Sequence, residues 1–365
     1  MGVPEKIKKI EEDMLKTQVN KHTERHIGVL RAKLSKLKME QEEQQARRSG
    51  SAIGYDVKKS GDGTVVLIGL PSVGKSTLLN VLTNAKSKVA AYQFTTLDVV
   101  PGVLDYNGAR IQVLDLPGII KGASSGKGLG KRVLAVARNA DLIMFVIDVF
   151  QPEARSLLEK ELRLTGIRVD EDPPNVVIET TTTGGISVVS LVKLTKITVE
   201  TVKDILRVYG MNSARVVIRQ DITDEQLLDV ILGTRVYIPS LTVMNKIDLV
   251  NAGFTNELMD KLPYKFVPIS AESNLNIEAL KQEMYRRLDF IRIYMRRRSG
   301  ETDYKEPMIV RNGSTVLEIC DKVHRKIKDD FRYALIWGKS VKFDGQRVGI
   351  THALMDEDVL TLVTK

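Results

Sequence analysis

An eight-residue loop between an apolar run and a helix-forming run constrains this chain more than any other feature. The apolar run is Thr64–Ile68, as short and continuous as a strand buried on both faces should be. The loop that follows reads Gly69-Leu70-Pro71-Ser72-Val73-Gly74-Lys75-Ser76. It matches the pattern G-x-x-x-x-G-K-S/T, in which backbone amides cradle phosphate groups. Such a match should arise by chance in roughly one chain in a hundred of this length, and more rarely between a strand and a helix.

This phosphate loop predicts binding of a nucleoside triphosphate without indicating the base. Its glycines let backbone amides turn toward phosphates, and the following helix adds partial positive charge at its N-terminus. We expect Lys75 to reach the β and γ oxygens and the Ser76 hydroxyl to hold Mg²⁺. The residues of this loop expected to contact the nucleotide are Gly69, Leu70, Pro71, Ser72, Val73, Gly74, Lys75, Ser76 and Thr77.

A second motif closes the apolar run Ile111–Leu114 and reads Asp115-Leu116-Pro117-Gly118. A D-x-x-G tetrad alone has little meaning, because it occurs by chance in most proteins. On the next suitable strand after a phosphate loop it gains weight. We then expect Asp115 to approach the Mg²⁺ ion and the Gly118 amide to meet the γ-phosphate.

A third motif chooses the base. Asn245-Lys246-Ile247-Asp248 follows the apolar run Leu241–Met244. A carboxylate such as that of Asp248 can accept hydrogen bonds from both N1–H and N2–H₂ of guanine, whereas adenine offers no such donor pair. A site built for those donors rejects adenine, so the motif favours a GTPase over an ATPase or a plain surface turn. Ser270-Ala271-Glu272 is expected to complete the pocket with a backbone amide for guanine O6.

The segment Tyr92-Gln93-Phe94-Thr95-Thr96-Leu97 lies between the phosphate loop and Asp115. A GTPase needs a threonine here whose hydroxyl joins Mg²⁺ and whose amide senses the γ-phosphate, and Thr95 and Thr96 both qualify. We expect Phe94 and Thr95 to line the nucleotide. Such a segment can order with GTP and loosen with GDP, so it predicts a switch.

The residue after Gly118 departs from many small GTPases, which place a glutamine there to orient water. Here it is Ile119, whose side chain cannot hydrogen-bond water. Intrinsic turnover should therefore be slow, with water positioned by backbone groups, another residue, a cation or a partner that reshapes the glycine-rich run Gly122–Gly130. An alternative remains: a GTP-gated binding module in which hydrolysis is incidental. Phosphate release that depends on Mg²⁺ and is lost in Lys75→Ala would separate the two.

The order of apolar and helical runs predicts the domain organisation. Alternating runs indicate an α/β domain with a mostly parallel sheet and helices on both faces. In the insertion we expect a break at Pro173–Gly185, followed by two apolar runs and two helices. The helices are predicted at about Val199–Tyr209 and at Asp224–Leu232, and the tail should hold one helix near Val316–Asp329. The predicted domains are an N-terminal helical arm (1–50), the nucleotide-binding domain (60–165 and 235–290), an α+β insertion (166–234) and a C-terminal domain (291–365).

Charge and cysteine content indicate which binding partners and which cellular compartment to expect. The net charge of +9 favours polyanionic partners such as RNA or ribosomes. One cysteine, Cys320, excludes an internal disulfide and fits a reducing cytoplasm. No apolar run approaches the ~20 residues that span a bilayer. An arginine cluster near the tail could grip phosphates, form a solvated face or be a salt-bridged hinge; its members are Arg286, Arg287, Arg292, Arg296, Arg297 and Arg298.

At this point a resemblance becomes specific. The runs 94–97, 101–102 and 115–120 resemble the Obg-type branch of translation-factor-related GTPases. More closely, the loop 69–77, Val236-Tyr237-Ile238-Pro239 and the segment 333–338 resemble the developmentally regulated GTP-binding (DRG) proteins. The likeness covers nearly the whole chain. It implies a P-loop GTPase domain, an insertion similar to domain 2 of ribosomal protein S5, and a C-terminal β-grasp TGS domain linked to RNA and ribosomes.

The resemblance also implies roles for single residues. It selects Thr96 as the switch threonine, which makes Ser76 and Thr96 the predicted Mg²⁺ ligands and Lys75, Thr96 and Gly118 the predicted catalytic groups. Related GTPases with an asparagine at the position of Ser72 are activated by K⁺, so K⁺ stimulation would here act through a shorter ligand. The expected ligands are GTP and GDP, and the expected partners are ribosomes or RNA and a regulatory protein that stimulates hydrolysis or stabilises the chain, all in the cytoplasm.

Overall fold

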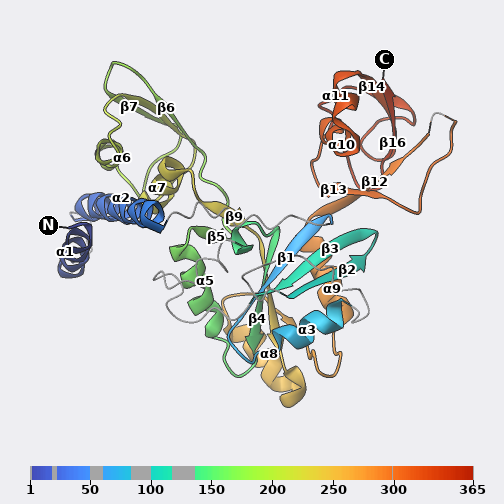
Figure 1. Ribbon diagram of the computed structural model, residues 1–365, viewed down its shortest axis with the longest axis horizontal. Helices are drawn as coiled ribbons and strands as arrows, with labels where there is room; N and C mark the ends of the chain where they lie inside the picture. Colours follow the sequence, from blue (N-terminus) through green and yellow to red (C-terminus); the bar gives the residue numbers. More distant parts are fainter. Residues whose placement is uncertain are drawn as a thin grey trace. The chain divides into compact units, whose positions relative to one another are not determined.

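The computed structural model describes residues 2–18, 23–49, 61–83, 100–116, 136–297 and 299–364. The chain divides into two compact units, each built from two stretches of sequence. One comprises residues 1–54 and 171–237, and the other comprises residues 55–170 and 238–365. Figure 1 labels their helices and strands.

A six-stranded sheet forms the centre of the second unit. Its order is β11-β10-β4-β1-β3-β2, and β2 alone runs antiparallel to its neighbour. All residues of β1 are buried, as its apolar sequence predicts. The strands are β1 (Gly63–Ile68), β2 (Val100–Tyr106), β3 (Ala109–Asp115), β4 (Leu142–Asp148), β10 (Ser240–Asn245) and β11 (Val267–Pro268). The predicted α/β class with a mostly parallel sheet is confirmed.

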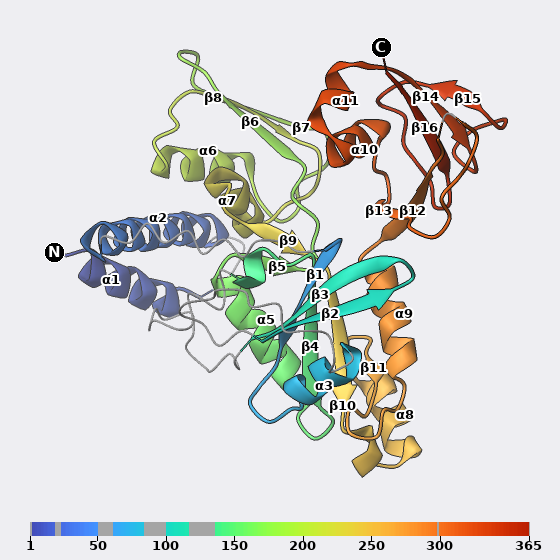
Figure 2. The same cartoon turned by 45° about the vertical axis from the view of Figure 1, so that its right-hand side comes forward.

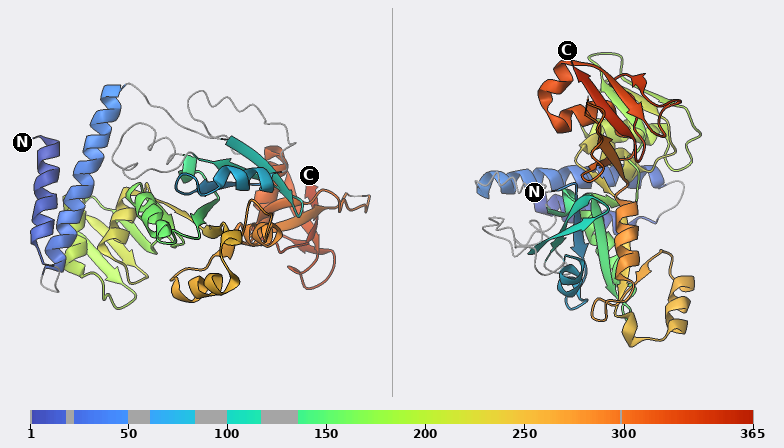
Figure 3. Two further views of the ribbon diagram at one scale, coloured as in Figure 1. Left: turned by 90° about the horizontal axis from the view of Figure 1, so that it is seen from below. Right: turned by 90° about the vertical axis from the view of Figure 1, so that its right-hand side faces the viewer.

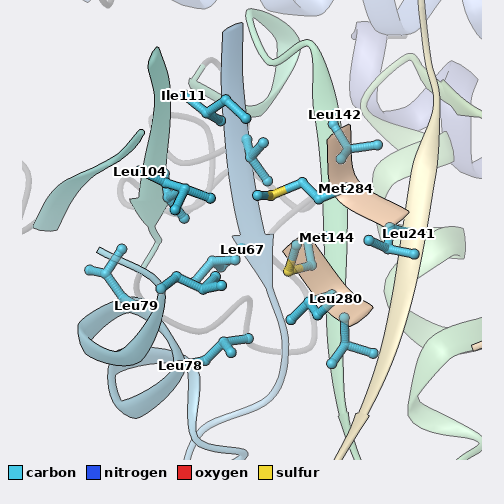
Figure 4. Packing of buried hydrophobic residues seen from close by; sticks show 14 of the residues in the cluster. Leu67, Leu78, Leu79, Leu104, Ile111, Leu142, Met144, Leu241, Leu280 and Met284 are labelled. Carbon is cyan, nitrogen blue, oxygen red and sulfur yellow. The ribbon is translucent and has the colours of Figure 1, made fainter. Parts of the chain in front are cut away.

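Helices cover both faces of this sheet. On one face, α3 (Lys75–Leu82) and α9 (Ile277–Arg287) bury leucine and methionine side chains in one cluster with alternate residues of the strands (Figure 4). On the other face, α5 (Ala154–Leu164) places the Arg155 guanidinium 3.9 Å from the centre of the Phe145 ring. The remaining elements are β5 (Ile167–Val169), β9 (Val236–Ile238), the 3₁₀ turn η2 (Ile247–Leu249) and α8 (Ala252–Lys261).

The C-terminal part of the same unit is a five-stranded sheet with two short helices. Its order is β13-β12-β16-β14-β15. The predicted single helix near 316–329 is wrong, because His324 is extended (φ −171°, ψ 134°) and its ring accepts a hydrogen bond from the Lys326 amide. The elements are β12 (Phe290–Met295), β13 (Met308–Arg311), α10 (Val316–Val323), α11 (Arg325–Asp329), β14 (Phe331–Trp337), β15 (Gln346–Val348) and β16 (Val359–Thr364).

The two sheets of this unit share buried side chains. Phe290, at the start of β12, and Ile309, in β13, belong to the same cluster as the leucines of α3 and α9. Arg311 forms an ion pair with Asp141 at 2.5 Å. The C-terminal sheet is therefore packed onto the nucleotide-binding sheet through apolar contact as well as charge.

The other unit combines the N-terminal helices with the insertion. Helices α1 (Val3–Lys16) and α2 (Glu24–Ser49) lie side by side (Figure 3). The insertion holds a three-stranded sheet in the order β6-β8-β7, with helices α6 (Val199–Val208) and α7 (Asp224–Leu232). Its strands are β6 (Val176–Thr180), β7 (Ile186–Ser190) and β8 (Ala214–Ile218). Strand β6 lies in the segment 173–185, where we expected no strand. It is a short, half-exposed edge strand, so its sequence lacks the apolar run that marks a buried strand.

The basic helix α2 packs against α6 and α7 within this unit. Ala32 is fully buried in one cluster with the apolar residues of those helices. Arg25 and Arg31 form ion pairs with Asp204 and Asp224, at 2.5 and 2.9 Å. Part of the arm's positive charge is therefore paired inside the unit.

Candidate nucleotide-binding site

The phosphate loop turns sharply between β1 and α3. Gly74 precedes the helix with φ +91°, a left-handed conformation that disfavours a side chain. A Cβ atom there would also lie 2.4 Å from Asn245 Nδ2. Glycine at this position thus satisfies both the turn and the close approach of the base-recognition motif.

Lys75, the first residue of α3, folds back over the loop. Its Nζ donates hydrogen bonds to the carbonyl oxygens of Gly69 (3.2 Å) and Leu70 (3.0 Å), and the side chain is largely buried. Burial lowers the pKa of this ammonium, and attraction to Asp115 partly offsets that effect. A cation that has lost much of its hydration gains from an anion beside it, which suits Lys75 to a phosphate.

Ser76 and Asp115 meet across the loop. The Ser76 hydroxyl donates to Asp115 Oδ2 at 2.6 Å. Asp115 is 7% exposed, and within the described part of the chain its buried Oδ1 has no hydrogen-bond partner. A hydroxyl beside a carboxylate with a spare oxygen is the donor set that Mg²⁺ prefers. These residues therefore fit the ion that the motifs imply.

Asn245 connects the phosphate loop with the base-recognition loops. Its Nδ2 donates to the Val73 carbonyl at 2.8 Å, and its Oδ1 accepts from the Ala271 amide at 3.0 Å. The side chain is 3% exposed, so these bonds are shielded from water. A shift of either loop would strain the other through this one amide.

Asp248 and Glu272 are exposed, while Ser270 is fully buried and its hydroxyl accepts from the Ser273 amide at 3.1 Å. Asp248 lies in η2, directly after β10. The motif residues thus follow the carboxyl ends of β1, β3, β10 and β11. In open α/β sheets this is the edge at which ligands bind.

One contributor was missed at the level of sequence. Asp148 ends β4, and its Oδ2 lies 2.7 Å from Lys246 Nζ while its Oδ1 accepts from the Phe150 amide. Lys246 also has φ +68°, a left-handed conformation that is uncommon for a residue other than glycine. The signal was available: an aspartate at the carboxyl end of a buried strand between two motif strands.

Comparison with known proteins agrees with this geometry. Residues 64–180 match the family model described as 50S ribosome-binding GTPase, residues 183–290 match the C-terminal region of that domain, and residues 291–364 match the TGS domain. Human developmentally-regulated GTP-binding protein 2 is 45% identical, with both chains fully covered. An uncharacterised GTP-binding protein of Methanocaldococcus jannaschii is 50% identical over all of this chain and 94% of its own.

The chain belongs to the DRG family. The resemblance seen in the motifs is thereby confirmed, and this DRG-family protein is a GTP-binding GTPase with a C-terminal TGS domain. A further relative, developmentally-regulated G-protein 3 of Arabidopsis thaliana, is 44% identical over all of this chain and 99% of its own. In the part of the chain that the structure describes, no helix is long and apolar enough to cross a membrane.

Several predicted site residues of this DRG-family GTPase lie outside the described residues, and their roles stay predictions. They are Phe94, Thr95, Thr96, Pro117, Gly118 and Ile119, together with the run 122–130 and Arg298. Of the predicted Mg²⁺ ligands, the structure therefore places Ser76 and not Thr96.

The arginine cluster separates into two kinds of side chain. Arg286 and Arg287 both bind Glu283, and hydrogen bonds from Arg286 hold the pKa of Glu283 below its usual value. Arg292 binds Asp356 and Glu357 on the loop before β16. These pairs lie within α9 or within the C-terminal sheet, so the interpretation as an interdomain hinge stays a prediction. No carboxylate among the described residues forms an ion pair with Arg296 or Arg297 at the end of β12, which makes these two the candidates for an outside partner.

Proposed function

We propose that this DRG-family GTPase hydrolyses GTP slowly to GDP and phosphate, with a Mg²⁺-dependent switch, and acts on ribosomes or RNA in translation. The observation that carries the hydrolytic part is the contact between Ser76 and Asp115 beside the buried Lys75. A cation and a paired set of oxygen donors at a helix N-terminus suit the phosphates of a nucleotide and its metal ion.

In this proposal each described residue has one task. Lys75 would exchange its loop carbonyls for the β and γ oxygens, while Ser76 and Asp115, together with Thr96, would hold the ion. Mg²⁺, when bound, would neutralise the charge that develops on the leaving phosphate oxygens. Thr96 and Gly118 sense the γ-phosphate, an assignment that rests on their motifs.

Guanine selection is proposed to rest on Asp248, supported by Asn245. Because Asn245 bonds to both Val73 and Ala271, the loop that meets the base and the loop that meets the phosphates are positioned by one side chain. Asp248 is exposed after β10 and free to accept from the guanine edge. The base and the phosphates are thereby read at a fixed separation.

Slow turnover is proposed because Ile119 cannot orient water. A regulatory protein would then supply that function or stabilise the chain, and K⁺ held near Ser72 is a second route to stimulation. Ser72 has φ +62°, a left-handed conformation of the kind that turns successive backbone N–H groups toward an anion such as a phosphate.

The ribosome or RNA role is supported by the family description and by the net charge of +9. We place this activity in the cytoplasm. The alternative is a GTP-gated binding module whose hydrolysis is incidental. Sedimentation with ribosomes in sucrose gradients tests the association: we expect more comigration with a non-hydrolysable GTP analogue than with GDP.

Hydrolysis is tested by phosphate release from GTP. We expect release that requires Mg²⁺, is lost in Lys75→Ala and persists in Lys193→Ala, a matched change of an exposed lysine in the insertion. Unchanged turnover in Lys75→Ala would remove the proposed mechanism. Tight GTP binding with no release at any Mg²⁺ or K⁺ concentration would favour the binding module instead.

A further inference from the structure

The TGS sheet has one covered face and one open face. In β14, Ala334 and Ile336 are fully buried against α10, in one cluster with Val316 and Ile319. Figure 2 shows α10 and α11 on one side of this sheet. The alternate residues Tyr333, Leu335 and Trp337 are only half-buried and project from the opposite face.

A hollow of about 400 Å³ lies on the open face. Leu335 and the rings of Tyr333 and Trp337 line it, together with Thr361 of β16, which stands opposite Leu335 in the register. Arg296 and Arg297 line it from the end of β12. Among the described residues that line this hollow there is no aspartate or glutamate. Its volume lies within the range of ligand pockets.

The Arg296 guanidinium lies over an aromatic ring. Its Cζ atom lies 4.3 Å from the centre of the Trp337 ring, and its Nε donates to the Gly300 carbonyl at 3.1 Å. The backbone beneath it is fixed, because the Arg296 amide donates to the Leu360 carbonyl and the Thr361 hydroxyl donates to the Arg296 carbonyl. Among the described residues no carboxylate forms an ion pair with Arg296, whereas Asp356 and Glu357 pair with Arg292.

A second guanidinium covers the other ring. Arg347 in β15 stands opposite Leu335 in the register, and its Cζ atom lies 3.9 Å from the centre of the Tyr333 ring. The open face therefore presents two aromatic rings of β14, each with an arginine guanidinium over it, one from beyond the end of β12 and one from the neighbouring strand β15. Exposed arginine–aromatic pairs are weak, so a stacking ligand can displace the guanidinium at small cost.

We propose that this open face binds single-stranded RNA, with bases stacked on Trp337 and Tyr333 and phosphates neutralised by Arg296, Arg297 and Arg347. The proposal rests on the RNA role suggested above and gives it a location. Interleaved rings and guanidinium groups suit single strands, whose bases are free to stack and whose backbone carries the negative charge. A duplex hides its bases, and an acidic peptide gives the rings no partner.

The sole tryptophan of the chain makes the face observable. Titration of the full chain with an unstructured oligouridylate of about ten nucleotides, within known site sizes, should quench Trp337 fluorescence saturably. Binding should weaken with salt, with a logarithmic slope of about −2 for three phosphate contacts. Quenching by a duplex or by polyglutamate, but not by the oligouridylate, would overturn the assignment to single strands.

Variants locate the binding, measured as the anisotropy of labelled oligouridylate. Arg296→Gln and Tyr333→Ala should each weaken binding about fivefold or more, whereas Trp337→Phe should retain most of it because a ring remains. Arg332→Gln is the matched control: this arginine is exposed on the same strand but does not line the hollow. GTP affinity and circular dichroism should be unchanged in all four.

Two results would overturn the inference, and they differ. If the chain binds RNA but Arg296→Gln, Tyr333→Ala and Arg332→Gln all bind like the parent, the face is wrong and the RNA role stands on another surface. If the parent chain binds neither oligouridylate nor ribosomes at low salt, the proposed RNA role fails together with this site, while the GTPase activity is untouched.

Discussion

The Asn245 side chain links two loops through hydrogen bonds. It lies so close to Gly74 that there is no room for a methyl group at that glycine. It bonds to Val73, which lies 172 residues away in the chain, and to Ala271. Gly74 lies directly against its Nδ2 atom. The smallest substitution at the phosphate loop should therefore disturb base recognition as well as phosphate binding.

Gly74→Ala tests this coupling. The added Cβ would clash with Asn245 and impose strain at φ +91°, so we expect GTP and GDP affinity to fall about tenfold or more. Fluorescent nucleotide titration measures the loss. Gly233→Ala is the control, because its φ of +60° is also left-handed but nothing lies within 4 Å of its Cβ; an equal loss of affinity in both would refute the coupling.

Asp248→Asn tests the guanine assignment. An amide cannot accept both hydrogen bonds from guanine, so GTP affinity should fall by about a hundredfold or more, and XTP should bind better than GTP. Competition titrations with both nucleotides measure the exchange. Asp260→Asn, an equal loss of charge on an exposed residue of α8, should bind GTP normally. Unchanged GTP binding in Asp248→Asn would contradict the proposal.

The helices and strands show which interactions the sequence pattern could reveal. Buried strands such as β1 and β4 were predictable, since an uninterrupted apolar run requires burial on both faces. Helix α7 was predicted at its observed bounds, Asp224–Leu232, and its capping box, in which Thr223 and Gln226 exchange hydrogen bonds, explains its sharp start. Strand β6 and the break at His324 were missed, because an edge strand has no core signal and the break depends on one local conformation.

The nucleotide site likewise has residues that the sequence motifs locate and contacts that they do not reveal. Motifs locate Lys75, Ser76 and Asp115, because phosphate and metal chemistry demand fixed residue types at fixed spacings. They do not show that Asn245 bridges two loops or that Asp148 pairs with Lys246. Those contacts depend on which strands become neighbours, and the spacing of residues along the chain does not encode that order.

Helix α2 tests whether the arm is part of the insertion unit. Ala32 is fully buried among the apolar residues of α6 and α7. Ala32→Leu should overpack this contact at a cost of about 1–3 kcal/mol and speed hydrogen exchange along residues 24–49. Lys33→Leu adds the same side chain at the exposed neighbouring position and should leave exchange unchanged. Equal exchange in both variants would show that α2 is not docked through Ala32.

At the scale of the whole molecule, the nucleotide-binding sheet and the TGS domain should respond to heat together. In β12, Phe290 belongs to the core of the nucleotide-binding sheet, whereas Ile291 and Ile293 belong to the core of the TGS sheet. Ile309 of β13 also belongs to the first core. A strand shared between two cores is expected to transmit unfolding from one to the other.

GDP tests this coupling through the single tryptophan, which lies in the TGS domain. Because a ligand of the native state stabilises whatever unfolds with it, GDP should raise the midpoint of thermal unfolding monitored by Trp337 fluorescence by several degrees. Phe290→Ala should lower that midpoint and shrink the GDP shift. A Trp337 transition that is indifferent to GDP would show that the TGS domain unfolds independently.

The discontinuous units also set an order of events during synthesis. Arg31 precedes its partner Asp224 by 193 residues, and a ribosome needs about 10 to 40 s to add them. During that time the basic arm exists without the acidic and apolar surface it packs on. Strands β1 to β4 are complete by then, whereas β10 and β11, with the guanine motif, are synthesised only after Asp224. The phosphate loop of a nascent chain is therefore synthesised long before the residues that recognise guanine.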